Sequence, residues 1–205
     1  MRQITLVRHA ITDWNSTGKF QGHTDTVLSD EGRLQAQALA RHLKKAKVDL
    51  IYSSSLSRAL ETAQIVFPNR DIIQDDRLRE LNFGEFEGFT HAENMQHAQG
   101  VWWFSDTFKN QAPNGESYET LRSRAVAWME SLPEDKHCVA FTHSGTIQML
   151  VSHVMGVEYP KWRKRLYLRH TGITRILFRD GEAIIERVND TRHLAKNGEV
   201  DPFAD

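Results

Sequence analysis

Short apolar runs that each end in charged or polar residues divide this chain into alternating strand-like and helix-like segments. The runs cover residues 4–7, 48–52, 71–74 and 138–142, and a final pair, 174–178 and 183–188, flanks the turn sequence Asp180-Gly181. Such alternation is typical of a parallel sheet with helical connections, and Asp-Gly between two apolar runs indicates a hairpin. The pattern predicts an α/β fold, a three-layer α/β/α sandwich with a mostly parallel central sheet.

Four segments between these runs have the apolar spacing of amphipathic helices. Their apolar stripes are Ala36, Leu39, Ala40 and Leu43; Leu56, Ala59, Leu60, Ala63 and Phe67; Tyr118, Leu121, Ala125, Trp128, Met129 and Leu132; and Ile147, Leu150, Val151 and Val154. Ser29 is placed to cap the first helix, any of the serines 53–55 could cap the second, and Gly156 is a stop signal for the last. The polar tail from Asn189 is expected to be frayed.

The segment from about 83 to 116 breaks this alternation and predicts a small helical cap over one edge of the domain. It is rich in aromatic residues and lacks a long regular period, which indicates short helices. The aromatic residues are Phe83, Phe86, Phe89, Trp102, Trp103, Phe104 and Phe108. A separate hydrophobic cluster under a long loop is an alternative that is compatible with a cap. We expect the whole chain, 1–205, to form a single domain that contains this insertion.

The composition fits one globular domain that works inside the cell. The 205 residues are 40% hydrophobic, and a net charge of −1 without a basic run argues against nucleic acid as a partner. A single cysteine, Cys138, lies in an apolar run and is expected to fill the core, in keeping with a reducing cytoplasm. Neither a signal peptide nor a membrane-spanning stretch is visible, so we expect a cytoplasmic protein without a membrane partner.

Charged and imidazole side chains follow the ends of several predicted strands. Arg8 and His9 come directly after the first strand and open a long polar loop, 8–28, of the kind that is usually functional. Glu80 lies just past the third strand, and His143 follows the 138–142 run. Because the carboxyl ends of parallel strands meet at one edge of a sheet, we expect these side chains to lie close together. The ordinary alternative is that they are solvated surface residues.

Arg58 strengthens the case for an anion-binding site at this edge. It lies in the first turn of the second predicted helix, where a cation opposes the helix dipole. A local pair with Glu61 is one explanation, and joint anion binding by Arg58 and the free helix N–H groups is the one we favour. Guanidinium groups match phosphate oxygens, an imidazole can be a nucleophile, and a carboxylic acid can protonate a leaving oxygen and then activate water. The set suits phosphoryl chemistry.

Five motifs resemble the histidine phosphatase (phosphoglycerate mutase-like) superfamily. They are LVRHAITDWN from residue 6, Gln21-Gly22, SSSLSRALETA from residue 53, RLRELNFGEFEG from residue 77 and FTHSG from residue 141, in the family's order. By this resemblance His9 is the phosphorylated nucleophile and Glu80 the proton donor. The resemblance also implies that Arg8, Arg58 and His143 hold the phosphoryl group, that Asn15 assists, and that Gln21, Gly22 and the Ser144 backbone N–H lie near the same pocket. It implies no metal and no other cofactor.

The chain departs from the family where Ala10 and Ile11 replace a glycine and an acidic residue after the catalytic histidine. Alanine lacks the freedom of glycine at positive φ, which affects the loop, and Ile11 could alter what packs over the phosphate. Because the nucleophile and the anion-binding residues remain, we expect activity to survive the change.

Within the family, the sequence favours a broad-specificity phosphatase over a phosphoglycerate mutase, which is the alternative. The chain is shorter than mutases of this type, and Lys109 is the only lysine or arginine between Glu80 and Arg122. The closing sequence VNDTRHL also resembles the broad-specificity phosphatases. The expected substrate is therefore a small phosphorylated organic molecule, and a homodimer is possible.

Two other classes of function are alternatives. A metal-dependent hydrolase could use His9, His143 and Glu80 as ligands, although no typical metal-binding spacing is present and two arginines would disfavour a cation. A protein that binds a phosphorylated ligand on the same fold without turnover is the other. Sensitivity to a chelator would identify the first class, and an isolable phosphohistidine would exclude the second.

Overall fold

A six-stranded sheet forms the centre of the protein in a computed structural model that describes residues 2–157 and 166–195. The strands are β1 (Gln3–Arg8), β2 (Leu50–Ser53), β3 (Ile73–Gln74), β4 (His137–Thr142), β5 (Ile173–Arg179) and β6 (Glu182–Asp190). Their order across the sheet is β3-β2-β4-β1-β5-β6. In this order, β3, β2, β4 and β1 pair in parallel, whereas β5 pairs antiparallel with both of its neighbours, β1 and β6. The expected mostly parallel sheet with a closing hairpin is confirmed.

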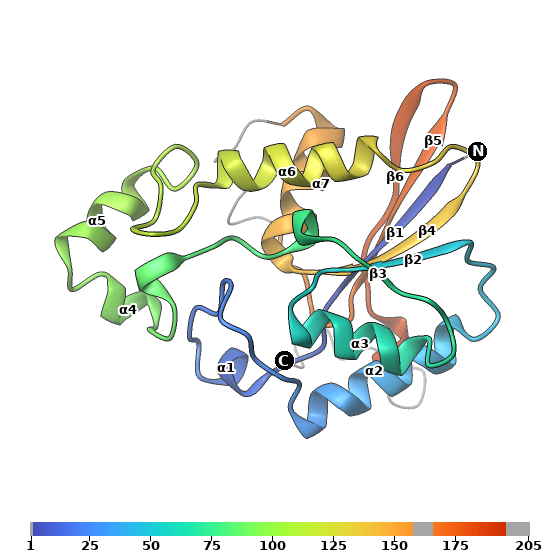
Figure 1. Ribbon diagram of the computed structural model, residues 1–205, viewed down its shortest axis with the longest axis horizontal. Helices are drawn as coiled ribbons and strands as arrows, with labels where there is room; N and C mark the ends of the chain where they lie inside the picture. The colour runs from blue at the N-terminus through green and yellow to red at the C-terminus, as the bar shows by residue number, and fades with distance from the viewer. Residues whose placement is uncertain (1, 158–165, 196–205) are drawn as a thin grey trace.

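Helices cover both faces of this sheet (Figure 1). They are α1 (Asp13–Ser16), α2 (Asp30–Leu43), α3 (Ser57–Val66), α4 (His91–Asn94), α5 (Ala98–Ser105), α6 (Tyr118–Glu130) and α7 (Ser144–Met155), with 3-10 turns at Asp76–Leu78, Gly84–Phe86 and Arg192–Leu194. α2 and α3 lie on one face, and α6 and α7 lie on the other. The result is the α/β/α sandwich that the sequence predicts.

The two central strands, β1 and β4, have apolar residues on both faces because both faces are covered. Ile4 and Leu6 pack with α6 and α7, whereas Val7 packs with α2 and α3. In β4, the expected core residue Cys138 is fully buried, and burial raises the pKa of its thiol to about 11. Each fully buried side chain of leucine or isoleucine size stabilises the fold by about 1.5–3 kcal/mol, so the sandwich holds the strand ends firmly.

The cap of Ser29 on α2 is confirmed, but the serines 53–55 do not cap α3. The Ser29 hydroxyl accepts a hydrogen bond from the Gly32 N–H at 3.1 Å. The residue before α3 is Leu56, whose side chain cannot cap, and a carboxylate oxygen of Asp25 accepts from the Ser57 N–H at 2.7 Å instead. The serines are used elsewhere, and Ser54 in particular contacts His143, as described below.

Residues 83–116, here called the cap, lie at one end of the molecule beyond α6 (Figure 1). Their aromatic residues form a hydrophobic cluster around the fully buried Trp103, which reaches Leu121 on α6 and Met149 on α7. The cap is joined to the loop after β1 by a bridge between Lys19 and Thr90 and by the Phe20 N–H, which donates to the Phe89 carbonyl at 2.9 Å. The cap and the separate hydrophobic cluster are therefore the same feature.

Residues 189–195 are ordered, contrary to the expectation of a tail that frays from Asn189, and residues 196–205 of that tail lie outside the described residues. Asn189 and Asp190 are the last residues of β6, and a 3-10 turn follows them. The Asp190 carboxylate accepts from the guanidinium groups of Arg187 and Arg192, and these bonds tie the 3-10 turn to the end of β6. None of the helices within residues 2–157 and 166–195 combines the length and the apolar character that a bilayer crossing requires.

Candidate active site

The parallel register of β1 and β4 brings the two predicted active-site histidines together. Arg8 is opposite Thr142, the last residues of the two strands. The His9 N–H donates to the Thr142 carbonyl at 2.9 Å, and the ring centroids of His9 and His143 lie 5.1 Å apart. Adjacent strand ends thus place two imidazoles side by side, as the order of the motifs predicts.

His9 is held as a neutral imidazole with one free nitrogen. Its ring is buried, and Nδ1 lies 2.7 Å from the carbonyl oxygen of Ala10. Because a carbonyl can only accept, Nδ1 must carry the proton, and Nε2 keeps its lone pair. Burial, followed by the charges of Arg58 and Arg8, holds the pKa of His9 well below its ordinary value of 6.5. The geometry therefore prepares Nε2 as a nucleophile.

Arg58 is a buried cation that donates to neutral groups. Its side chain is 1% exposed, and its guanidinium donates to the carbonyls of Gly22 at 2.7 Å and Thr24 at 3.0 Å. Within the described chain, its Nε has no hydrogen-bond partner. Burial lowers the pKa of Arg58 to about 10, so the group is still charged at neutral pH. A buried charge without a hydrogen-bonded counter-ion is a strong binding site for an anion.

The ordinary explanation for Arg58, a pair with Glu61, is wrong. The Glu61 carboxylate accepts from the Arg33 guanidinium at 2.8 Å and from the Leu28 N–H at 3.2 Å, both away from Arg58. The local helix pair is therefore absent, and Arg58 faces the loop 22–24 instead.

Two further imidazole nitrogens near His9 are buried without a partner in the described part of the chain. His143 is fully buried, and its Nε2 lies 2.9 Å from the Ser54 hydroxyl, whereas its Nδ1 is unpaired. His170, in the chain before β5, has its ring centroid 5.7 Å from that of His9 and an unpaired Nε2. Burial lowers the pKa of His143 well below 6.5 and that of His170 to about 2, with Arg8 adding to the second. The sequence did not predict that His170 lies beside His9.

Glu80 is held at the N-terminus of α7. Its two carboxylate oxygens accept from the Leu81 N–H at 2.8 Å and from the Gly145 N–H at 3.0 Å. A Cβ atom on Gly145 would lie only 2.2 Å from Glu80 Oε1. The glycine of the FTHSG motif therefore permits this close approach of the carboxylate to the helix.

The loop after β1 supplies amides to the same cavity. The side-chain amide oxygen of Asn15 accepts from the Thr12 N–H at 3.1 Å. The side-chain amide oxygen of Gln21 accepts from the hydroxyls of Thr12 and Thr26 at 3.0 and 2.6 Å. With both carbonyl oxygens used, the NH₂ groups are what Asn15 and Gln21 can offer to an anion. Gly22 follows with φ +50°, in the left-handed region that favours glycine.

Glu87 holds this loop in place, a role that the sequence did not predict. Its carboxylate accepts from the N–H groups of His23 at 2.8 Å, Thr24 at 2.7 Å and Phe83 at 3.1 Å. It lies in the quoted motif RLRELNFGEFEG, which was the available signal, but nothing in the local pattern separates it from a surface glutamate.

These side chains surround a cavity of about 150 Å³. Its lining is Arg8, His9, Asn15, Lys19, Phe20, Gln21, Gly22, Arg58, Glu80 and Phe83. His143, whose ring centroid lies 5.1 Å from that of His9, and Ser144 are not part of this lining. A larger hollow of about 330 Å³ lies on the outer side of α6, where Arg122 and His153 alternate with exposed carboxylates. Only the smaller cavity combines a buried cation with a neutral imidazole.

The replacements at Ala10 and Ile11 leave this arrangement intact. Ala10 is fully buried, its N–H donates to the Thr62 hydroxyl at 3.1 Å, and its φ is not positive, so no glycine is required there. Ile11 is almost buried and is outside the cavity lining. Its side chain therefore packs in the interior rather than in the cavity wall.

Comparisons with known proteins agree with this geometry. A protein named "Putative phosphoserine phosphatase 2" from Hydrogenobacter thermophilus is 32% identical over 200 residues, which cover 94% of this chain and 98% of the relative. "Probable phosphoglycerate mutase GpmB" from Escherichia coli is 33% identical and covers 95% of each chain.

A solved structure also matches along nearly the whole length. The phosphoserine phosphatase of Entamoeba histolytica, in complex with 3-phosphoglyceric acid, superposes with a TM-score of 0.84 at 30% identity, over 95% of this chain and 100% of that one. The family model of the histidine phosphatase superfamily (branch 1) matches residues 4–191. The match includes every motif around the cavity, and the chain belongs to the histidine phosphatase superfamily.

Proposed function

We propose that this protein hydrolyses phosphomonoesters of small organic molecules through a phosphohistidine at His9. The observation that carries the proposal is the state of His9: a buried neutral imidazole whose Nδ1 proton is fixed on a carbonyl, in a cavity that is also lined by the cations Arg8 and Arg58. A phosphate dianion would be attracted to the arginines, and its phosphorus would meet an available lone pair.

The proposed reaction has two steps, transfer of the phosphoryl group to His9 and its hydrolysis. In the first, His9 Nε2 forms a bond to phosphorus, the phosphorus–oxygen ester bond breaks, and Glu80 gives its proton to the leaving oxygen. In the second, a water molecule attacks the phosphohistidine, Glu80 takes a proton from that water, and the nitrogen–phosphorus bond breaks. Inorganic phosphate leaves, and neutral His9 and protonated Glu80 are restored.

Groups around His9 would stabilise the charge of the transferring phosphoryl group. In this proposal Arg8 and Arg58 bind two of its oxygens, and the buried His143 supplies a further donor from its side of the His9 ring. Asn15, Gln21 and Gly22 form the polar wall of the cavity. The Ser144 N–H, at the start of α7, would be a further donor to the phosphoryl group. The binding energy would rest on buried donors that need little reorganisation.

Hydrolysis is favoured over phosphoryl transfer to a second acceptor because of the cavity wall. Phe20 and Phe83 pack with ring centroids 4.7 Å apart beside the cavity, and Lys19 is the only lysine in the lining. A mutase needs cations that hold both substrate and product through their other anionic groups, and the cap offers only Lys109. The cavity size favours small substrates. Relatives named for phosphoserine and phosphoglycerate make those molecules the first candidates.

The test is hydrolysis of an aryl phosphate with excess chelator, comparing the natural sequence with His9→Ala. Turnover that persists with the chelator and disappears in the variant supports the proposal. Loss of turnover with the chelator alone would instead support the metal-dependent alternative, although no three metal-ligating side chains gather in the described residues. Absence of turnover from the folded natural protein would favour a selective mutase or a binding protein. A cytoplasmic location and a homodimer remain proposals.

A further inference from the structure

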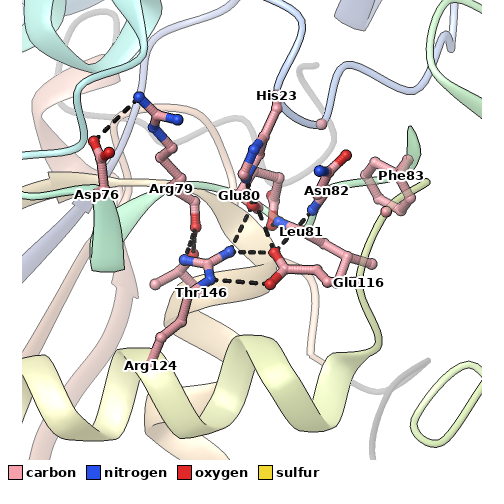
Figure 2. A network of polar contacts seen from close by, with 12 residues as sticks. His23, Asp76, Arg79, Glu80, Leu81, Asn82, Phe83, Glu116, Arg124 and Thr146 are labelled. Atoms are coloured by element: carbon pink, nitrogen blue, oxygen red, sulfur yellow. Dashed lines mark hydrogen bonds and ion pairs between the residues drawn. The ribbon is translucent and has the colours of Figure 1, made fainter. Parts of the chain in front are cut away.

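A partly buried arginine outside the cavity holds the segment of chain that carries Glu80. Arg124 lies on α6, and its guanidinium faces the backbone of residues 77–80 (Figure 2). Nη1 donates to the carbonyls of Arg77 at 2.9 Å and Arg79 at 2.7 Å, and Nη2 donates to the carbonyl of Glu80 at 2.7 Å. One side chain therefore binds three carbonyls in a segment of irregular structure.

Glu116 uses the rest of this guanidinium. Its carboxylate accepts from Nη2 of Arg124 at 2.5 Å and from Nε at 3.2 Å, a two-bond pairing of carboxylate and guanidinium. The side chains are 19% and 13% exposed. With the three carbonyls, all five N–H groups of Arg124 are engaged, which a lysine with three N–H groups could not reproduce.

The same pair also holds the base of the cap. Glu116 Oε1 accepts from the Asn82 N–H at 2.9 Å, and the Glu116 N–H donates to the Asn82 carbonyl at 2.9 Å. Asn82 and Glu116 stand at the two ends of the cap, where the chain leaves and rejoins the sandwich. His23 adds a contact from the loop after β1, with Nε2 2.9 Å from the Glu80 carbonyl.

We propose that Arg124 and Glu116 are positioning residues for proton transfer by Glu80. This inference rests on the proposed function, in which Glu80 protonates the leaving oxygen. The Glu80 main chain is fixed from one side by Arg124, and its carboxylate is fixed from the other by the Gly145 N–H. Because a misplacement of about 1 Å can cost about 10²-fold in rate, loosening the main chain would slow the step that needs the proton.

The leaving group distinguishes this role from a purely structural one. An alkyl phosphate has a poor leaving oxygen that needs the proton, whereas a nitrophenyl phosphate leaves readily without it. We would measure kcat and KM for phosphoserine and for p-nitrophenyl phosphate with Arg124→Met, Arg124→Lys, Glu116→Gln and Glu80→Gln. Arg122→Met is the control, because it removes a cation from the same helix without touching the 77–80 segment.

We expect Glu80→Gln to lower kcat/KM for phosphoserine, which reports the step that expels the leaving group, by about 10²-fold or more, and Arg124→Met by about tenfold. The loss of kcat/KM on p-nitrophenyl phosphate should be much smaller in both, although kcat can fall on either substrate because Glu80 also activates the water of the second step. The double variant Glu80→Gln with Arg124→Met should be no slower than Glu80→Gln alone, because both changes act on one group. Arg124→Lys should lie between the natural protein and Arg124→Met.

Equal losses of kcat/KM on the two substrates in Arg124→Met or Glu116→Gln would overturn the inference, since they would indicate general disturbance of the site. Should Arg124→Met fail to fold, judged by its circular dichroism, Arg124→Lys and Glu116→Gln decide the question by the same comparison. If Glu80→Gln itself loses kcat/KM equally on both substrates, the acid role of Glu80 in the proposed function fails. A different outcome, in which Glu80→Gln loses more on phosphoserine than on p-nitrophenyl phosphate but the Arg124 and Glu116 variants do not, would leave the acid role intact and overturn only the positioning role.

Discussion

The His9 and His143 rings lie 5.1 Å apart, tilted by 55°, although 133 residues separate them along the chain. Each follows the last residue of a central parallel strand, so the sheet register alone fixes their spacing. The two differ in their contacts. His9 presents a free Nε2 because a carbonyl holds its Nδ1 proton, whereas His143 has its Nε2 on Ser54 and its Nδ1 unpaired.

This difference predicts different consequences of losing each ring. His9→Ala should abolish turnover and phosphohistidine formation, because among the described histidines only His9 belongs to the cavity lining. His143→Ala should lower kcat by about 10²–10³-fold, the usual cost of losing a group that stabilises developing charge, yet still form the intermediate. Alkaline quenching and mass spectrometry would locate the phosphoryl group. His97→Ala, an exposed histidine on the cap, is the control. Labelling of His143 in place of His9 would contradict the assignment.

Arg58→Lys should lower kcat/KM by about 10²-fold or more, although it keeps the charge. A lysine lacks the planar fork that donates to Gly22 and Thr24 while an Nε–H remains for an anion. Arg33→Lys is the matched control, because Arg33 is half-exposed and pairs with carboxylates at the surface. The measurement is steady-state kinetics together with the affinity for inorganic phosphate. Full activity in Arg58→Lys would mean that Arg58 binds no phosphoryl oxygen.

Much of the fold and most of the cavity follow from local sequence. Arg8, His9 and His143 could be predicted because each directly follows a buried apolar run, and parallel strands end at a common edge. Arg58 could be predicted because a cation in the first turn of a helix is unfavourable unless it serves another purpose. In these cases the local pattern and the tertiary arrangement agree.

The residues that escaped prediction act through contacts distant in sequence. His170 comes from the irregular chain before β5, where no strand end or helix start marks it. Arg124 is one of several charged residues on α6, and only the packing of that helix against residues 77–80 reveals its five hydrogen bonds. The serines at 53–55 have the composition of a helix cap, but the Ser54 hydroxyl contacts His143. The N–H of Ser57 at the start of α3 donates to Asp25 instead.

The pH profile of kcat/KM should be bell-shaped with an optimum on the acidic side of neutral. Since the pKa of His9 is held well below 6.5, its nucleophilic nitrogen stays available in mildly acidic solution. Glu80 must hold a proton at the start of the reaction, so the rate should fall as the pH rises. Steady-state kinetics from pH 4.5 to about 9 would show this. A rate that climbs without limit above neutral pH would contradict the acid role of Glu80.

Stability should fall as the pH drops below about 6.5, the ordinary histidine value. His9 and His143 have folded-state pKa values far below 6.5, so in this range the unfolded chain binds protons that the folded chain does not. The free energy of unfolding should then fall by about 1.4 kcal/mol per pH unit for each of the two histidines. Urea unfolding at several pH values measures this. His9→Asn should reduce the slope, and the control His97→Asn should not; an unchanged slope in His9→Asn would contradict the shifted pKa.

Gly145→Ala should remove activity on alkyl phosphates while the protein remains folded. The added methyl group would lie 2.2 Å from Glu80 Oε1, so the carboxylate must leave the Gly145 N–H, whereas the nearest atom of another residue, on Leu121, is 3.4 Å away and tolerable. Alanine also has a higher helix propensity than glycine by about 1 kcal/mol, so α7 itself should not suffer. We expect kcat/KM for phosphoserine to fall by about 10²-fold and that for p-nitrophenyl phosphate to fall far less. If both substrates keep their natural rates, the observed carboxylate position is not the one from which Glu80 acts.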